Sequence, residues 1–234
     1  MEDVILTAFV GGLISLDRTA FLQLMVSQPL VAGVLVGFSL GDTVTGLAIG
    51  SVLQLLWIGD FPVGSSVPPN ETAATVIATS ISIITGREVT AIGQPPYSVM
   101  AFSILLSIPL AVLCQKVDIY VRSYNRRFVL SAERKLESRN FLHLEGENLK
   151  GLFSFFVASF SSILILLGFG LYLAGTIYPL IPEPFLKGLL ISFSLLVSLG
   201  VAVSIRTARG MGKWRFSILF AGFLTGMAIL YLNK

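Results

Sequence analysis

The segment that decides the fold is residues 49–72, IGSVLQLLWIGDFPVGSSVPPNET, where polar residues and prolines interrupt an apolar run. Residues 43–59 carry no charge, and Asp60, three prolines and Glu71 then follow. A carboxylate at membrane depth costs about 2.5–3.5 kcal/mol. Non-helical backbone at that depth is tolerated only where it packs against protein or lines a wet cavity. We therefore interpret this segment as a polar binding site; a solvated loop at the membrane surface is the alternative.

The composition is that of a membrane protein. The chain has 234 residues, of which 54% are hydrophobic and only 12% charged, whereas soluble domains carry about 25% charged residues. Its one cysteine, Cys114, rules out a disulfide within one copy, and we expect it to be a small buried hydrophobe. Its one histidine, His143, leaves little material for a metal cluster or a catalytic triad. We expect no catalytic residue, metal or cofactor, and no binding to nucleic acid.

Charge-free windows indicate the membrane segments. The windows at 89–115, 151–182, 188–205 and 216–233 can each span a bilayer, since a spanning helix needs about 20 apolar residues. The windows before residue 87 are short and rich in glycine, which favours broken or re-entrant helices. Glycines spaced four apart (Gly33, Gly37 and Gly41; Gly46 and Gly50) favour close helix packing, with close approach of a substrate as the alternative. We predict an all-α polytopic membrane protein, a helical bundle.

Residues 116–150 form the one long polar segment, with eight Lys or Arg against five Asp or Glu. Apolar residues recur within it at helical spacing, which predicts an amphipathic helix. The basic excess near membrane ends places it in the cytoplasm. It would rest on lipid headgroups or, alternatively, dock a soluble partner. We thus divide the chain into membrane segments with the interrupted loop (1–115), a cytoplasmic amphipathic connector (116–150) and C-terminal transmembrane helices (151–234).

Amide, hydroxyl and carboxylate side chains gather around the interrupted segment. A sugar presents a ring of hydroxyls that each donate and accept hydrogen bonds, so such a mixed lining suits it, and Trp57 and Phe61 offer apolar faces for stacking. The adjacent Asp17 and Arg18 are interpreted as an interfacial anchor or as cavity lining, and Asp42 as a helix cap. The candidate substrate-binding residues are Gln28, Gln54, Asp60, Ser65, Ser66, Asn70 and Glu71.

At this point the sequence resembles a known family, the membrane subunit IIC of the mannose/fructose/sorbose family of the phosphoenolpyruvate-dependent sugar phosphotransferase system (PTS). The ordered motif covers about residues 13–80; the rest agrees in length and hydropathy alone. The matching positions are Gln28-Pro29-Leu30-Val31, Gly37, Leu40-Gly41-Asp42, Thr45-Gly46, Ile49-Gly50, Gly59, and Val63-Gly64 through Pro68-Pro69-Asn70.

The resemblance implies a multi-pass transporter subunit of the bacterial inner membrane, not an enzyme. It would work with a homologous membrane subunit IID in an oligomeric complex, and bind an external hexose-type sugar at the loop from Gln54 to Asn70. A soluble IIB, charged by IIA, would phosphorylate the sugar. The chain departs from the family pattern at Gln54, where an acidic residue is often found, and at Gln28, where arginine is. A degenerate homologue, serving as a membrane scaffold or receptor for a soluble partner, is the alternative.

Overall fold

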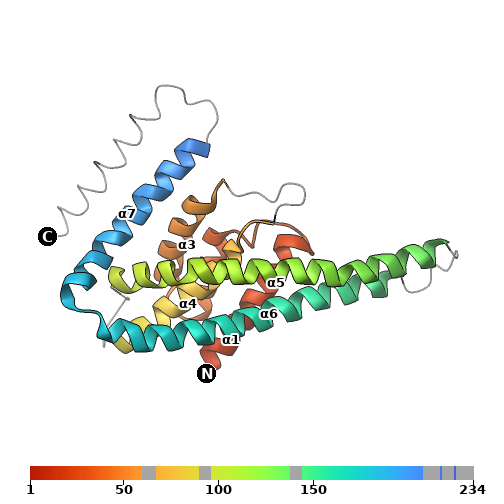
Figure 1. The fold of residues 1–234 in the computed structure, drawn as a ribbon, viewed down its shortest axis with the longest axis horizontal. Helices are drawn as coiled ribbons and strands as arrows, with labels where there is room; N and C mark the ends of the chain where they lie inside the picture. The colour runs from red at the N-terminus through yellow and green to blue at the C-terminus, as the bar shows by residue number, and fades with distance from the viewer. Residues whose placement is uncertain (60–66, 90–95, 138–143, 208–216, 218–223, 225–234) are drawn as a thin grey trace.

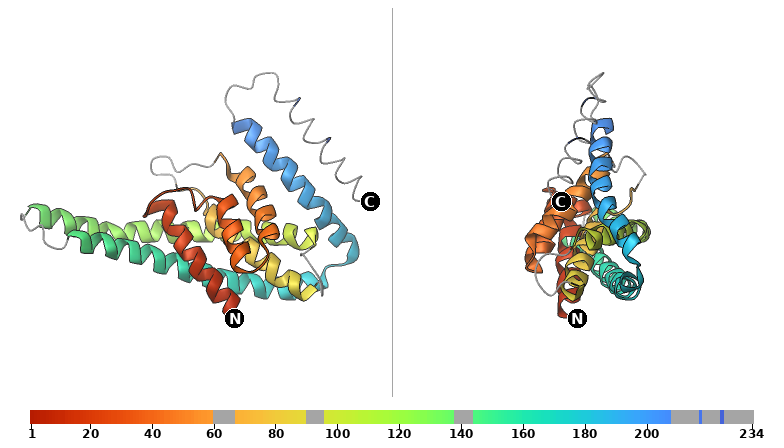
Figure 2. Two further views of the ribbon diagram at one scale, coloured as in Figure 1. Left: turned by 180° about the vertical axis from the view of Figure 1, so that it is seen from behind. Right: turned by 90° about the vertical axis from the view of Figure 1, so that its left-hand side faces the viewer.

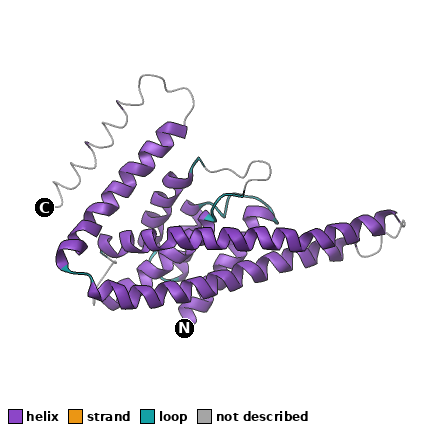
Figure 3. Ribbon diagram, viewed as in Figure 1, coloured by secondary structure: helices purple, strands orange, loops and turns teal. Residues whose placement is uncertain are grey.

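The computed structural model describes residues 1–59, 67–89, 96–137 and 144–207, together with 217 and 224. Every regular element within these residues is a helix, which confirms the predicted all-α class (Figure 3). The elements are α1 (Glu2–Thr19), α2 (Pro29–Ser39), α3 (Thr43–Trp57), α4 (Glu71–Val89), α5 (Tyr97–Glu137), α6 (Leu144–Ile177), the short 3₁₀ helix η1 (Tyr178–Leu180) and α7 (Glu183–Thr207).

Three of the described helices are long and apolar enough to cross a membrane, namely α5, α6 and α7. They match the predicted windows at 89–115, 151–182 and 188–205. The fourth predicted window, 216–233, lies largely outside the described residues. The described residues therefore contain three of the four membrane-length helices that the hydropathy predicts.

The helices α2 and α3 form a short hairpin of 11 and 15 residues. At 1.5 Å per residue they are about 17 and 23 Å long, less than the roughly 30 Å of a hydrocarbon core. Gly41, at φ +79°, makes the turn between them, and Asp42 caps α3 by accepting a hydrogen bond from the Thr45 N–H at 3.0 Å. This agrees with the predicted short N-terminal helices and confirms Asp42 as a cap.

Glycine allows the two backbones of this hairpin to touch. A Cβ atom on Gly33 would collide with the carbonyl oxygen of Gly46, and one on Gly50 would lie 2.6 Å from the carbonyl oxygen of Pro29. Both are closer than real Cβ contacts allow. The four-residue glycine spacing therefore serves helix packing, the first of the two predicted roles.

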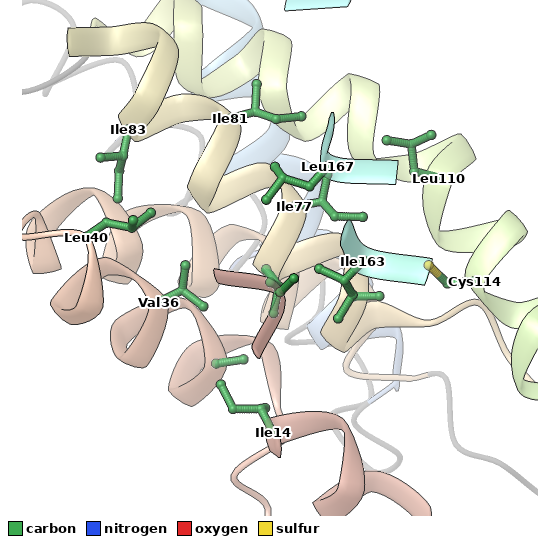
Figure 4. Close-up of a cluster of buried hydrophobic side chains, with 14 of the residues drawn as sticks. Ile14, Val36, Leu40, Ile77, Ile81, Ile83, Leu110, Cys114, Ile163 and Leu167 are labelled. Carbon is green, nitrogen blue, oxygen red and sulfur yellow. The ribbon is translucent and has the colours of Figure 1, made fainter. Parts of the chain in front are cut away.

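The central helix of the body is α4, which packs against α1, α2, α3, α5 and α6. Almost all of its side chains are buried. Figure 4 shows Ile77 and Ile81 of α4 meeting Ile163 and Leu167 of α6, with Cys114 of α5 at the edge of the same cluster. Cys114 is fully buried there, as predicted.

The helices α5 and α6 continue together beyond this body (Figures 1 and 2). We call residues 116–137 of α5 with residues 144–151 of α6 the arm. The Asn125 amide donates to the carbonyl oxygen of Gly151 at 3.1 Å, and Lys135 pairs with Glu147 at 2.6 Å. The division at 115/116 and 150/151 stays a prediction; α5 and α6 run through these positions without a break.

We predict that Gly33→Ala destabilises the protein by about 1–3 kcal/mol, because the new methyl group must push the α2–α3 backbones apart. Gly175→Ala is the matched control: nothing lies within 4 Å of its new Cβ, and alanine in a helix is favoured over glycine by about 1 kcal/mol. Thermal unfolding of the detergent-solubilised chain measures both. Equal stability of the two variants would contradict the close packing.

Candidate functional site

Two of the predicted binding residues, Gln28 and Gln54, lie side by side. The Gln54 Nε2 donates to Gln28 Oε1 at 2.9 Å, and the backbone N–H of Leu30 donates to Gln54 Oε1 at 3.3 Å. Gln28 immediately precedes α2, whose start is set by Pro29 at its first position. Gln54 lies in the last turn of α3. We call this contact the amide pair; both side chains are half-buried.

Asn70 and Glu71 begin α4, and protein groups engage their polar atoms. The Asn70 Oδ1 accepts from the Ala73 N–H at 2.9 Å and so caps the helix. Its Nδ2 donates to Asp118 Oδ2 at 2.9 Å. Glu71 accepts two hydrogen bonds from Arg18, at 2.9 Å to Oε2 and 3.3 Å to Oε1. These two predicted binding residues are therefore held inside a network of the protein itself.

Arg18, at the end of α1, is the centre of that network. Besides Glu71 it binds Asp118 of α5 at 2.7 Å and the carbonyl oxygen of Pro69 at 3.1 Å. Its side chain is only 8% exposed. One planar guanidinium thus joins α1, the start of α4 and the base of the arm through charge-assisted hydrogen bonds. The structure places Arg18 inside the protein and not on an exposed interface.

A second set of hydrogen bonds joins this network to the amide pair. The Thr72 hydroxyl donates to the carbonyl oxygen of Ser27 at 2.7 Å. Ser27 is in turn held by Asp17, which accepts from its N–H at 3.0 Å and from its hydroxyl at 3.1 Å. Residues 27–28 and 70–72 are therefore neighbours. We call the whole set the polar junction: Asp17, Arg18, Ser27, Gln28, Gln54, Asn70, Glu71, Thr72 and Asp118.

The backbone leading into the junction is strained. Leu22, Gln23 and Met25 have φ values of 59°, 52° and 64°, a left-handed region that residues other than glycine rarely adopt. Asp17 Oδ1 accepts from the Leu24 N–H at 2.6 Å and so helps to hold this conformation. Such strain persists only where surrounding contacts impose it, and it is concentrated at functional sites.

Sequence reasoning missed Asp118 and did not assign Arg18 its structural role. These residues are 100 positions apart, and Arg18 and Glu71 are 53 apart, so no spacing rule connects them. The available signal was a lone aspartate, Asp118, at the edge of an apolar run, where an unpaired charge is costly. Trp57, proposed for stacking, packs on the cluster around Ile49 and Leu53. Asp60, Phe61, Ser65 and Ser66 lie outside the described residues.

The amide pair has hydrogen-bonding groups of the kind that a neutral polar ligand requires. Each glutamine has two N–H donors and an oxygen with two lone pairs, and their mutual contact uses one donor and one acceptor. Within the described part of the chain, no group of three or more His, Cys, Asp or Glu residues could hold a metal ion. The junction thus offers uncharged hydrogen-bonding groups next to a rigid, charge-paired support.

Comparison with known proteins shows the family. Residues 2–233 match the family described as "PTS system sorbose-specific iic component". The mannose-specific EIIC component of Escherichia coli K12 is 28% identical over 224 residues, covering 95% of this chain and 77% of the relative. The sorbose-specific EIIC component of Klebsiella pneumoniae is 27% identical over 205 residues, with 85% and 70% covered. The fructose permease IIC component of Bacillus subtilis is 29% identical over 178 residues, with 76% and 62% covered.

Two solved structures are also similar. One, described as a membrane protein, has a TM-score of 0.70 at 24% identity over 100% of this chain and 96% of its own, and shows the shared fold. The other is the mannose transporter ManYZ in complex with microcin E492, with a TM-score of 0.58 at 25% identity over 99% and 93%. With a family match along almost its whole length and the membrane-length helices described above, the chain belongs to the mannose/fructose/sorbose family of PTS IIC components, which are sugar permease subunits.

Proposed function

We propose that this chain binds an external hexose-type sugar in the bacterial inner membrane and delivers it for phosphorylation by a partner IIB subunit, as the IIC subunit of a PTS permease. The observation that carries the proposal is the amide pair of Gln28 and Gln54, which lies within the polar junction of a IIC-family chain. The interpretation as a degenerate scaffold is not favoured by the comparisons, since the relatives are named as sugar-specific PTS EIIC components and as a fructose permease IIC component.

The chemistry of the amide pair suits a sugar. Each sugar hydroxyl donates one hydrogen bond and accepts others, and a glutamine amide offers both kinds of partner in one planar group. An amide forgoes the charge-assisted strength of a carboxylate. It also avoids the cost of an ionised group at membrane depth. The two glutamines thus support a site for an uncharged ligand that is bound and then released.

Asn70 and Glu71 act as positioning residues in this proposal. Gln54 lies at the end of α3 and Asn70 at the start of α4, so the segment between them is attached to the body at both ends. Arg18 fixes the second end through Glu71 and Pro69. We propose that Asp60, Ser65 and Ser66, which the sequence places in that segment, complete the site.

Partners are proposed from family membership and from the exposed apolar surface. Large apolar side chains are exposed along α6 and α7, among them Phe153, Ile165 and Phe169 of α6 and Phe185 and Leu195 of α7. A lipid environment or a second membrane subunit would cover such faces. We propose a homologous IID subunit as the membrane partner in an oligomeric complex, and soluble IIB and IIA as the phosphoryl carriers.

Uptake of a panel of radiolabelled hexoses tests the proposed function. Cells would express this chain with its IID partner, with and without the soluble IIB and IIA proteins. We expect a sugar phosphate to accumulate only with the full set, because capture by phosphorylation requires all components. Absence of uptake by a correctly assembled complex would contradict the proposal and indicate the degenerate homologue.

For the amide pair, we predict that Gln54→Ala reduces uptake at least about tenfold. Without the Gln54 amide, the bound sugar hydroxyl and Gln28 each lose a hydrogen-bond partner. Gln54→Glu loses the donor to Gln28 Oε1 but keeps an oxygen that accepts from the Leu30 N–H and from a sugar hydroxyl, so it should retain more uptake than Gln54→Ala. Ser51→Ala, one turn earlier on α3, removes only a hydroxyl bound to the carbonyl oxygen of Leu47 and is the control. The site assignment fails if Gln54→Ala and Ser51→Ala transport equally well at equal membrane levels.

For the network, we predict that Arg18→Met destabilises the protein by about 3–5 kcal/mol, because Glu71 and Asp118 are left as unpaired, largely buried carboxylates. Neutralising both in the triple variant Arg18→Met, Glu71→Gln, Asp118→Asn should recover most of the folded protein. Fluorescence-detected size exclusion with a temperature ramp measures this. A triple variant as unstable as the single one would show that the lost charge pairing is not the cause.

A further inference from the structure

Cations and tyrosines share one face of the arm. Lys116, Tyr120, Tyr124, Arg127 and Arg134 follow one another at intervals of four, four, three and seven residues, which places them on one side of a helix. All five are exposed, and Tyr120 is 71% exposed. We call this set the cation–tyrosine stripe. It lies on the side of α5 opposite Asp118, the residue through which this helix joins the polar junction.

Among the residues of α5, no acidic side chain interrupts the stripe. The three acidic residues of the same stretch of α5 are Asp118, Glu133 and Glu137. At about 100° per residue they lie about 80° or more from the centre of the stripe, and Asp118 is engaged by Arg18 and Asn70. The positive charges of the stripe therefore add to one another on that face.

Contacts within the stripe fix the position of Arg127 beside a surface groove. The Arg127 guanidinium lies 3.3 Å from the centre of the Tyr124 ring, and its Nε donates to the Tyr124 carbonyl oxygen at 3.1 Å. Next to it, a surface groove of about 380 Å³ is lined by Arg127, Leu130, Ser131, Arg134 and Lys135. Stacking holds the guanidinium in place and leaves its outer N–H groups for a planar carboxylate or a phosphate.

The arm presents this face rigidly. On another side of α5, Asn125 donates to the carbonyl oxygen of Gly151 of α6 at 3.1 Å; at the edge of the groove, Lys135 pairs with Glu147 of α6 at 2.6 Å. Two paired helices lose less conformational freedom on binding than a flexible loop, which favours docking. Tyrosine and arginine are also the residue types most enriched in protein interfaces.

Most of the stripe extends past the lipid headgroups. Lys116 is the first charge after the apolar part of α5, so it marks the edge of the hydrocarbon. Arg134 is 18 residues further on, about 27 Å along a helix and about 20 Å along the membrane normal even at a tilt of about 40°. The headgroup region is only about 5–8 Å deep. A water-soluble partner fits this reach better than a lipid surface does.

We propose that the cation–tyrosine stripe is the docking surface for an acidic face of a soluble protein, which under the proposed function is the IIB subunit. The proposal rests on that function and assigns it a contact site. Carboxylates or a phosphoryl group on the partner would pair with Arg127 and Arg134, and apolar groups would pack on Tyr120 and Tyr124. The positive-inside rule places this face in the cytoplasm, where such a partner occurs.

Binding of purified IIB to the full-length chain and its IID partner in nanodiscs tests the proposal. We expect the double variant Arg127→Glu, Arg134→Glu to bind IIB at least about tenfold more weakly, as for close charge pairs across interfaces. Arg126→Glu is the matched control for Arg127→Glu, because it is the exposed neighbouring arginine off the stripe. It should change the affinity by less than about twofold, since exposed charges off the interface are screened.

The possible results distinguish failure of the docking proposal from failure of the proposed function. If the wild-type protein binds IIB and the variants Arg126→Glu and Arg127→Glu lose equal affinity, the stripe is not the docking surface, and the proposed function stands. Wild-type protein that binds no IIB overturns the proposed partnership as well. A fluorophore on Ser131→Cys, with the buried Cys114 as the sole native thiol, reports the surroundings of the arm. We expect quenching by a water-soluble quencher; dominant quenching by labelled lipid overturns the proposal in favour of headgroup binding.

Discussion

The structure depends most on the pairing of Arg18 with Glu71 and Asp118. One guanidinium donates to both carboxylates and to the Pro69 carbonyl, and Asn70 donates to Asp118, so each of these largely buried polar groups has a partner. Buried ion pairs of this kind often add little net stability but tolerate few alternatives. The pairing therefore selects one arrangement of α1, α4 and α5. That arrangement brings residues 27–28 next to residues 70–72.

Around this network the helices use two different kinds of contact. The α2–α3 hairpin packs backbone on backbone through glycine, where dispersion and not burial from water favours association in a membrane. The α4 helix is lined with small hydroxyl side chains; Thr75 and Ser80, for example, donate to carbonyls four residues earlier. In this way α4 buries polar residues without exposing them to lipid.

The sequence alone predicted features whose causes are local. Asp42 was predicted as a cap because its partner, Thr45, is three residues away, and the spanning helices were predicted because apolar length is read along the chain. Gln28 and Gln54 entered the candidate site through residue type, but their mutual hydrogen bond was not foreseen. The contact of Arg18 with Asp118 depends on how α1 and α5 cross, which no spacing in the sequence encodes. The family resemblance, drawn from residues 13–80, is confirmed by a match over residues 2–233.

One consequence follows from the continuity of α5. Its first half packs in the helical body, Asp118 joins the network, and its second half continues into the arm without a break. A stiff rod that is fixed near its middle acts as a lever. A rotation of about 10° about Asp118 would displace the backbone at Arg134, 16 residues away, by about 4 Å at 1.5 Å of rise per residue. Small adjustments at this pivot are thereby mechanically amplified at the distal end of the helix.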